Sequence, residues 1–366
     1  MRVLGLMSGT SLDGIDAALL HTDGEQIAAF GPSATFAFLP AEKAAIECAI
    51  KDALGVDVDQ GFAEPDSFQA AADAVTEAHV RAVQLMRDQH DVGDIDLIGF
   101  HGQTVLHRPD HKLTIQLGDG AALARRVKVD VVCDLRQNDM ALGGQGAPLV
   151  PVYHRALLAA RDIDGPVAML NIGGVANMTY MDADTLIAFD TGPGNGLLDQ
   201  WVVAHGLGAF DEDGALAASG EVDRPCLEQL MAHPYVRAPF PKSLDRYDFS
   251  LDGVKGLSAA DGAATLAAFT VDCLLEAARL LPKPPKLWVV CGGGRKNRAI
   301  MARLSEHAGA QCVDADDLDL RGDDIEAEAF AFLAARSVRG LPITFPGTTG
   351  VKAPATGGVL WLNSET

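Results

Sequence analysis

Two short glycine-rich turns, each lying between two apolar runs, constrain the fold of this chain more than any other feature. The first turn, at residues 8–14, separates apolar runs at 3–7 and 15–20, and the second, at Gly173 and Gly174, separates two similar runs. Apolar runs joined by such turns predict β-hairpins. Glycine lets backbone N–H groups approach an anion, and Ser and Thr hydroxyls add donors. Each turn is therefore either an ordinary hairpin turn or a phosphate-binding one.

A third glycine-rich turn, at residues 292–294, follows the apolar run 287–291 and precedes a helix-like stretch from Arg295. Two hairpins of this type, followed by a strand, a glycine turn and a helix, resemble the layout of the superfamily of sugar kinases, acetate kinase and actin. The resemblance implies an α/β protein of two duplicated actin-like (ribonuclease H-like) domains. It also implies an interdomain active-site cleft that closes on ATP from both sides.

Six separate motifs resemble the 1,6-anhydro-N-acetylmuramic acid kinase family, in the family's order. They are residues 5–16, 100–104, 139–149, 171–174, 189–195 and 324–327. They extend from the first strand to the last helix, so the resemblance covers essentially the whole chain. It implies an ATP-dependent kinase that opens the anhydro bridge with water and phosphorylates O6, giving N-acetylmuramate 6-phosphate and ADP. Such an enzyme serves peptidoglycan recycling and amino-sugar catabolism.

The length of 366 residues exceeds the size at which one core normally divides, so two domains are expected. We predict domains at 1–128 and 129–366, with the C-terminal segment packing back on the first. Apolar spacing predicts an amphipathic helix over 67–90, with inner-face residues Ala71, Ala74, Val75, Ala78, Ala82, Val83 and Met86. Residues 96–100 predict a short buried strand that ends at His101. Further helices are expected at 259–281, 295–309 and 324–336.

The formal net charge of −21 argues against binding to nucleic acid or to an anionic membrane. It does not exclude ATP, because local donors and Mg²⁺ can offset the overall field. The six cysteines include no C-x-x-C pair and are expected to be reduced core residues. No apolar stretch reaches the length of a membrane span, so we expect a soluble cytoplasmic protein. The family resemblance further implies a homodimer.

Asp190 is the residue for which a catalytic role is most strongly expected. It follows the apolar run 186–189 and precedes glycines that would admit a substrate. Ligands of open α/β sheets bind at the ends of strands, and a carboxylate there can accept a proton from an attacking oxygen. The alternative is that Asp190 caps a helix starting near Gly196. The resemblance implies the catalytic role, with Asp190 taking the proton of the water that attacks C1.

The three turns supply the residues expected to bind ATP. These are Gly9, Thr10, Ser11, Leu12, Asp13, Gly14, Ile15, Asp16, Gly173, Gly174, Gly292, Gly293, Gly294 and Asn297. Asp13 and Asp16 either hold Mg²⁺ through water or fix the turn. Many relatives in the superfamily begin this hairpin with an aspartate, but here apolar Leu4, Gly5 or Leu6 takes that place. No direct metal ligand is therefore assigned.

Five residues are expected to contact the sugar: His101, Gln103, Arg136, Asp139 and Glu326. Arg136 is suited to a bidentate grip on the lactyl carboxylate, or it forms a surface ion pair. His101 is either a ligand or a structural hydrogen-bonder. Glu326 is either a second acid facing the sugar or an acid favoured by a helix start. The other histidines show no zinc-binding spacing.

Three functions are compatible with the sequence. The first is the anhydro-sugar kinase, which consumes ATP and water. The second is an ordinary sugar or acid kinase of the same fold, in which Asp190 would deprotonate a substrate hydroxyl. The third is a non-catalytic nucleotide-dependent switch, which would leave Asp190 and the motif at 139–149 without a role. Whether the anhydro bridge is needed in the substrate distinguishes the first from the second.

Overall fold

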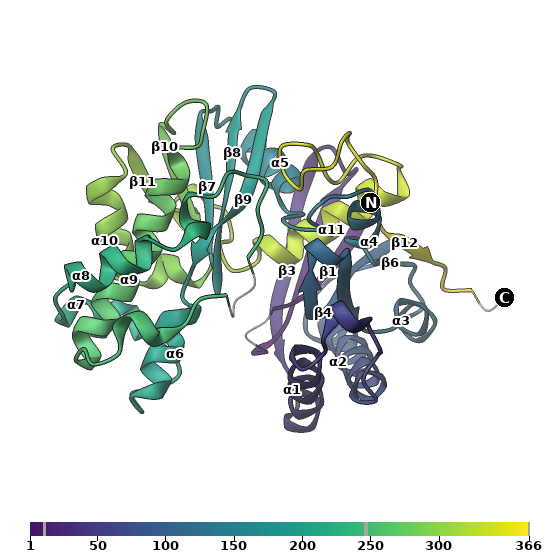
Figure 1. Cartoon of the computed structure of the whole chain (residues 1–366). Helices are drawn as coiled ribbons and strands as arrows, with labels where there is room; N and C mark the ends of the chain where they lie inside the picture. The colour runs from purple at the N-terminus through teal and green to yellow at the C-terminus, as the bar shows by residue number, and fades with distance from the viewer. Residues whose placement is uncertain (10–11, 245–247, 365–366) are drawn as a thin grey trace. The chain divides into compact units, whose positions relative to one another are not determined.

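The computed structural model describes residues 1–9, 12–244 and 248–364. It divides into two compact units (Figure 1). The first unit comprises residues 1–160 together with 324–366, and the second comprises residues 161–323.

The first unit is built on a seven-stranded mixed sheet. Its strands are β1 (Arg2–Ser8), β2 (Gly14–Thr22), β3 (Ile27–Ala37), β4 (Leu97–Arg108), β5 (Leu113–Leu117), β6 (Val131–Cys133) and β12 (Val359–Trp361). The order is β12-β6-β4-β1-β2-β3, with β5 paired to β4. The hairpins β1–β2 and β2–β3 are antiparallel, whereas β1, β4 and β6 run parallel. The predicted first hairpin is confirmed, and β3 adds a third antiparallel strand to it.

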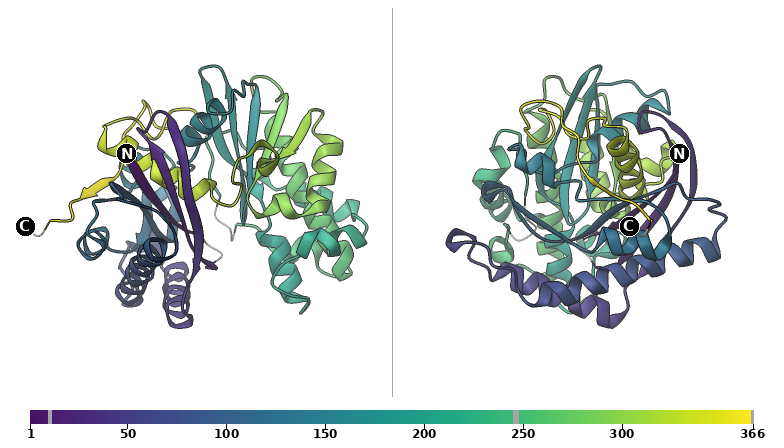
Figure 2. Two further views of the ribbon diagram at one scale, coloured as in Figure 1. Left: turned by 180° about the vertical axis from the view of Figure 1, so that it is seen from behind. Right: turned by 90° about the vertical axis from the view of Figure 1, so that its right-hand side faces the viewer.

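Helices cover both faces of this sheet (Figures 1 and 2). They are α1 (Pro40–Leu54), α2 (Ser67–Gln89), α3 (Gly120–Val127), α4 (Gln137–Ala141), α5 (Pro151–Ala159) and α11 (Ile325–Val338). The predicted helix over 67–90 is α2, and every predicted inner-face residue is buried except Ala74, which is half-buried. On the other face, α11 lies directly on β1 and β4: a Cβ atom at Gly5 or Gly99 would overlap the backbone of α11.

The second unit contains a five-stranded sheet of the same design. Its strands are β7 (Val167–Ile172), β8 (Val175–Asp182), β9 (Thr185–Pro193), β10 (Leu287–Cys291) and β11 (Gln311–Asp314). Their order is β11-β10-β7-β8-β9, with antiparallel β7–β8–β9 and parallel β7, β10 and β11. This matches β6-β4-β1-β2-β3 strand for strand. The recurrence confirms the predicted duplication and the two actin-like domains.

The core of the second unit forms between this sheet and its helices, α6 (Gly196–Ala204), α7 (Ala215–Ser219), α8 (Arg224–Met231), α9 (Ala259–Ala278) and α10 (Arg298–His307). Helix α9 is buried along most of its length, and its own side chains are small or apolar on nearly every face. It replaces the longer helix predicted over 259–281. The helix predicted over 295–309 is a short 3-10 helix, Gly293–Lys296, followed by α10.

Two sequence predictions about the first unit are wrong. The strand expected to end at His101 continues as β4 to Arg108, because the polar residues that follow also pair, with β5. The domain boundary expected after residue 128 would cut the sheet, because β6 pairs with β4. The division instead falls after residue 160. The predicted packing of the C-terminal segment on the first domain is confirmed, because residues 324–366 belong to the first unit.

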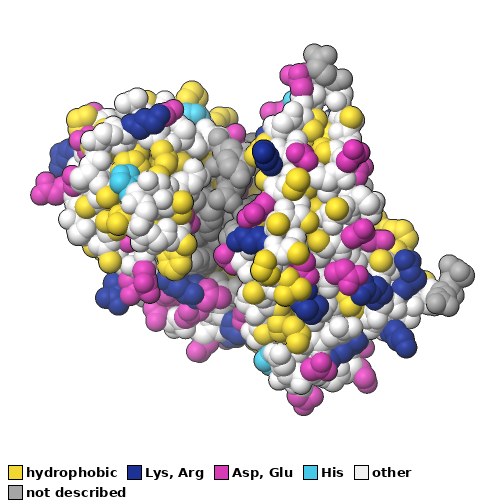
Figure 3. All heavy atoms as spheres, turned by 90° about the horizontal axis from the view of Figure 1, so that it is seen from below, with side chains coloured by type: hydrophobic (Ala, Val, Ile, Leu, Met, Phe, Trp, Pro, Cys, Tyr) yellow, Lys and Arg dark blue, Asp and Glu magenta, His cyan; other side chains and the backbone are white. Residues whose placement is uncertain are grey.

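No helix among the described residues is long and apolar enough to cross a membrane. The six cysteines are all free thiols, and three of them are buried. On the face drawn in Figure 3, Lys and Arg side chains are interspersed with Asp and Glu side chains.

Candidate active site

The turn between β1 and β2 places backbone groups at the carboxyl end of β1. Leu12 adopts a left-handed conformation with φ of 56°, and its N–H donates to the carbonyl of Gly9 over 3.4 Å. The side chains of Leu12 and Ile15 are buried in the core. These two residues would therefore serve ATP only through their backbone. Of the expected ligands, Thr10 and Ser11 lie outside the described residues.

The two aspartates of this hairpin differ in their surroundings. Asp13 is exposed at the turn, whereas Asp16 is half-buried and its Oδ1 accepts a hydrogen bond from Thr35 Oγ1 over 2.6 Å. Gly14 packs against β3, where a Cβ atom would lie 2.7 Å from the carbonyl oxygen of Phe36. Asp16 thus links β2 to β3, while Asp13 presents its carboxylate to solvent.

Strand β4 holds this turn from beside it. Ser8 Oγ donates to the carbonyl of Gly102 over 2.9 Å, and Gln103 Nε2 donates to the carbonyl of Gly9 over 3.2 Å. Gln103 is fully buried, and its Oε1 has no hydrogen-bond partner among the described residues. A buried polar atom without a partner is costly unless a ligand or water satisfies it. Gln103 therefore both fixes the turn and offers one acceptor.

His101 and Arg136 lie together behind the turn. Arg136 Nη2 is 3.2 Å from His101 Nε2, and Arg136 Nη1 donates to the carbonyl of Gly146 over 2.8 Å. Burial, aided by the positive charge of Arg136, holds the pKa of His101 well below its usual value. The imidazole is therefore neutral, and its Nε2 accepts the hydrogen bond from Arg136. Arg136 is oriented toward the 143–146 loop and is not a surface residue.

The carboxylate of Asp139 is occupied by protein donors. Its Oδ2 accepts from the N–H of Gly146 over 2.7 Å, and its Oδ1 accepts from Thr349 Oγ1 over 2.6 Å. Asp139 is almost fully buried, and Gly144 leaves room for it because a Cβ there would overlap the carboxylate. Asp139, which was predicted to contact the sugar, therefore shapes the glycine-rich loop at 143–146.

Glu326 occupies the first turn of α11 and is half-buried. The close packing of α11 on β1 and β4 fixes the helix backbone at this point. Neighbouring Glu328 is fully buried, and the hydroxyl of Tyr153 donates to it. The position of Glu326 fits either alternative stated for it, because a first-turn acid also complements the helix dipole.

Asp190 lies inside β9 rather than at its end, which is a correction to the sequence expectation. The strand continues to Pro193 because residues 192 and 193 still pair with β8. Asp190 is 8% exposed, and its Oδ2 accepts a hydrogen bond from the N–H of Leu244 over 2.8 Å. Helix α6 begins at Gly196 with Asn195 as its N-cap residue. The capping alternative for Asp190 is therefore excluded.

The β7–β8 turn is held by the residues that lead into α6. The N–H of Asn195 donates to the carbonyl of Gly173 over 2.7 Å, and the N–H groups of Gly194 and Gly196 donate to the carbonyl of Gly174. A Cβ atom at Gly194 would overlap the carbonyl of Gly173, so this close approach requires glycine. A Cβ at Gly173 would meet no atom closer than 3.5 Å, so space remains for a ligand in front of it.

The third turn follows β10 and packs on the end of β7. Gly292 has φ of 74°, and a Cβ atom there would crowd Asn171 and Ile172; the same is true of Gly294 and Ile172. These two glycines therefore allow the turn to lie against β7. Gly293 is more open. Asn297 caps α10, since its Oδ1 accepts from the N–H groups of Ala299 and Ile300.

Arg295 is a residue of this turn that the sequence analysis did not assign to the site. Its side chain is 3% exposed and pairs with Asp314, Asp316 and Asp323, and its Nη1 also donates to the carbonyl of Gly292 over 3.2 Å. The hydrogen bond from Arg295 lowers the pKa of Asp323 to about 2. Arg295 thus joins the ends of β10 and β11 beneath the glycine turn.

We expect Arg295→Met to lower the free energy of unfolding by about 2 to 3 kcal/mol, because it leaves neighbouring carboxylates without their shared cation. The same change should raise the KM for ATP more than it changes kcat, since the 292–294 turn loses its anchor. Guanidinium unfolding and steady-state kinetics measure the two effects. Arg298→Met is the matched control, because Arg298 is 83% exposed. Equal effects of both substitutions would contradict this role.

The sequence analysis did not identify one further segment, which lies beside Asp190. Residues 235–244 surround Asp190 with an aromatic side chain, Tyr235, and a buried lysine, Lys242. The only signal in the sequence is a lysine placed within an apolar, proline-rich stretch, 236–242. Such a lysine is also compatible with a surface loop, so no function could be read from it.

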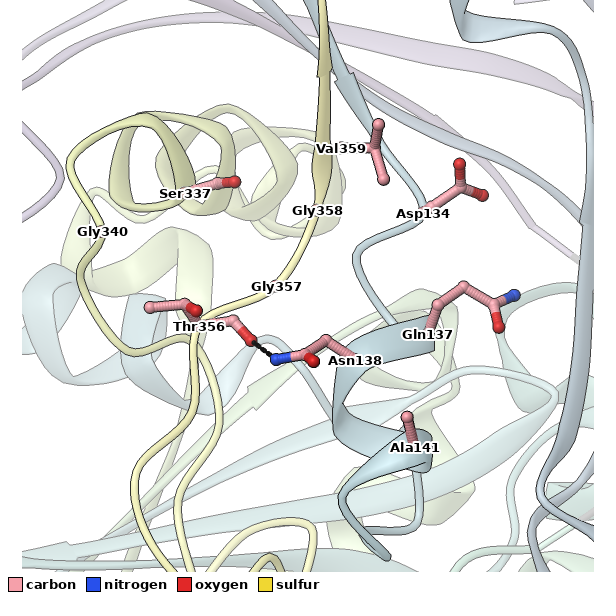
Figure 4. A pocket seen from close by; sticks show the side chains of 10 residues that line it. All are labelled: Asp134, Gln137, Asn138, Ala141, Ser337, Gly340, Thr356, Gly357, Gly358 and Val359. Atoms are coloured by element: carbon pink, nitrogen blue, oxygen red, sulfur yellow. Dashed lines mark hydrogen bonds between the residues drawn. The ribbon is translucent and has the colours of Figure 1, made fainter.

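A cavity of about 520 Å³ lies elsewhere in the first unit (Figure 4). It is lined by α4 and by the segments around Ser337 and Gly357, and Asn138 donates to the carbonyl of Thr356 across it. None of the predicted site residues lines this cavity. It is therefore separate from the candidate active site.

Comparisons with known proteins agree with the motif resemblance. A protein-family model described as anhydro-N-acetylmuramic acid kinase matches residues 1–363. This chain belongs to that family. An anhydro-N-acetylmuramic acid kinase of Rhodopseudomonas palustris is 49% identical over 98% of this chain and 99% of its own length. One of Rhodospirillum rubrum is 50% identical over 98% of this chain and 93% of its own length.

Among solved structures, the chain is similar to component A of the (R)-2-hydroxyglutaryl-CoA dehydratase of Acidaminococcus fermentans. The TM-score is 0.46 at 13% identity, covering 93% of this chain and 99% of the other. Membership of the anhydro-N-acetylmuramic acid kinase family rests on the full-length sequence relatives and not on this likeness.

Proposed function

We propose that this chain is an ATP-dependent kinase that opens 1,6-anhydro-N-acetylmuramic acid with water and phosphorylates O6. The proposal rests on relatives named for this activity, of which two are 49% and 50% identical to this chain over 98% of its length. The six motifs and the burial of Asp190 beside a backbone donor support it. The products are N-acetylmuramate 6-phosphate and ADP.

In the proposed mechanism, Asp190 is the general base. A water oxygen attacks C1 while Asp190 accepts the water proton, and the C1–O6 bond breaks with its electron pair passing to O6. O6 then attacks the γ-phosphorus of ATP, and ADP leaves. A buried carboxylate fixed by the Leu244 N–H is suited to this role because its orientation is set before the substrate binds.

The turns of both units are proposed to contact ATP. Gly9–Asp16 and Gly173–Gly174 would face its phosphates through backbone N–H groups, and Gly292–Gly294 its nucleoside. The described residues contain no cluster of three or more His, Cys, Asp and Glu side chains that could hold a metal ion. We propose that Mg²⁺ enters with the ATP phosphates, since Mg²⁺ in kinase sites needs only one or two carboxylates. The exposed carboxylate of Asp13 is the candidate protein contact.

On this proposal, His101, Gln103, Arg136 and Glu326 serve the sugar, and Asp139 shapes the loop beside it. The protein would act in the cytoplasm as a homodimer in peptidoglycan recycling. Its substrates are small molecules and water, without a nucleic-acid or membrane partner. The net charge of −21 supports the last point, because it disfavours polyanionic surfaces.

The test is incubation with Mg-ATP and 1,6-anhydro-N-acetylmuramic acid in ¹⁸O-labelled water, followed by mass spectrometry. We expect a sugar 6-phosphate with one ¹⁸O at C1. Phosphorylation of open sugars alone would instead identify an ordinary sugar kinase. Nucleotide binding without any phosphorylated sugar would identify a nucleotide-dependent switch.

A further inference from the structure

In the segment from Tyr235 to Leu244, a buried lysine near the end hydrogen-bonds back to backbone carbonyls at the start. Lys242 Nζ donates to the carbonyl of Tyr235 over 2.8 Å and to that of Val236 over 3.3 Å. Lys242 is 7% exposed, and its ammonium lies 4.5 Å from the centre of the Tyr235 ring. Two carbonyls and an aromatic face together replace part of the water that the ammonium gives up on burial. We call residues 235–244 the Lys242 loop.

Both ends of the Lys242 loop contact Asp190. The Tyr235 hydroxyl donates to the backbone carbonyl of Asp190 over 2.9 Å, and the Leu244 N–H donates to its carboxylate over 2.8 Å. The N–H of Asp190 in turn donates to the carbonyl of Lys242 over 3.1 Å. Backbone and side chain of Asp190 are therefore both fixed by one loop. The shape of that loop depends on the lysine.

The loop is also anchored beside Asp190 through its aromatic side chains. Phe240 stacks on Phe189, with ring centres 5.1 Å apart and planes 9° apart, and Lys242 Nζ lies 5.7 Å from the Phe189 ring centre. Removing the ammonium would leave the carbonyl of Val236 without this donor, whereas the carbonyl of Tyr235 would keep only the N–H of Ala238. A buried acceptor without a partner costs about 1 to 3 kcal/mol, so the loop would rearrange.

The charges around Asp190 come from several elements. Burial lowers the pKa of Lys242, while nearby Cys273 and, to a smaller extent, Asp190 raise it in opposition. Burial and Asp190 both raise the pKa of Tyr235, and burial raises that of Cys273 on α9, so these two groups are neutral. Asp248 adds a negative charge near Tyr235. Among these groups, Lys242 is therefore the cation.

We propose that Lys242 is a positioning residue for Asp190, closing the 235–244 loop so that the carboxylate is held in one orientation. The proposal rests on the function proposed above only in taking Asp190 as the base. The arrangement of the loop itself does not depend on that function.

The first test is hydrogen exchange at the Leu244 amide in Lys242→Met, which replaces the ammonium with an apolar side chain of similar length. We expect exchange to become at least about 10-fold faster, because the donor to Asp190 loses its support. Lys255→Met is the matched control, since Lys255 is 74% exposed and lies in the same unit. Unchanged protection of Leu244 would overturn the proposal, whether or not the proposed function holds.

The second test is kinetic. We expect Lys242→Met to lower kcat by about 10- to 100-fold with a nearly unchanged KM for ATP. Lys242→Arg keeps a hydrogen-bond donor at this position and should restore most of the lost kcat. A kcat in Lys242→Met equal to that of the wild type would overturn the proposal.

A milder variant keeps the proposal testable if Lys242→Met does not fold. Tyr235→Phe retains the ring and the lysine but loses the hydroxyl that donates to Asp190. We expect a smaller loss of kcat, about 3- to 10-fold. Wild-type turnover in this variant would overturn the proposal. Loss of turnover in Asp190→Asn tests the proposed function separately.

Discussion

Asp190→Asn is expected to reduce turnover of the anhydro sugar by about 1,000-fold or more while leaving ATP affinity within about twofold. Asparagine has the same shape as aspartate, and its amide oxygen can still accept the hydrogen bond from the Leu244 N–H. It cannot take a proton from water. The substitution therefore removes the base and leaves the packing of β9 in place. Mass spectrometry of the sugar phosphate and calorimetry with ATP measure the two quantities.

Asp184→Asn is the matched control, because Asp184 is exposed at the β8–β9 turn of the same hairpin. It should behave as wild type in both measurements. Near-normal turnover in Asp190→Asn would remove Asp190 from the mechanism. Lost ATP affinity in that variant would instead indicate that Asp190 serves the nucleotide.

The fold could be predicted where the signal is local. The turns at residues 8–14 and at Gly173 and Gly174 lie between apolar runs, and short-range sterics are enough to predict hairpins there. The duplication followed from the order of the three glycine turns. The domain boundary could not be predicted in this way. It depends on the pairing of β6 with β4 and on the return of α11 to β1, which join residues far apart in the sequence.

The candidate site, too, could be predicted only where the signal is local in the sequence. Asp190 was singled out because it follows an apolar run and precedes glycines, and the family resemblance favoured catalysis over helix capping. Its position inside β9 could not be predicted, because the strand is extended by pairing with β8. Arg295 and Lys242 were missed because their roles come from partners on other segments. Arg295 needs Asp314, Asp316 and Asp323, and Lys242 acts through Asp190 and the carbonyls of its own loop.

Three buried histidines make the first unit sensitive to acid. Burial lowers the pKa of His79 to about 4 and that of His154 to about 3, and holds that of His101 well below its usual value. His79 is fully buried, and its Nδ1 donates to the carbonyl of Val75 over 2.7 Å. Its Nε2 has no hydrogen-bond partner among the described residues. A second proton on His79 would therefore be a buried charge without an acceptor.

The sign of the pH effect follows from these shifts. The unfolded chain binds protons at its histidines as the pH falls below about 6.5, whereas the folded chain does not until much lower pH. The free energy of unfolding should therefore fall from pH 6.5 downward, with the contribution of His79 ending near pH 4. Each such histidine contributes a slope of up to about 1.4 kcal/mol per pH unit.

We expect His79→Gln to reduce the loss of stability between pH 6.5 and pH 5 by about 2 kcal/mol relative to wild type, whatever its effect at neutral pH. Guanidinium unfolding at a series of pH values measures this difference. His111→Gln is the matched control, because His111 is exposed in the same unit. It should leave the pH dependence unchanged. An unaltered slope in His79→Gln would mean that His79 takes up its second proton over the same pH range in the folded and the unfolded protein. The acid sensitivity would then arise from other groups.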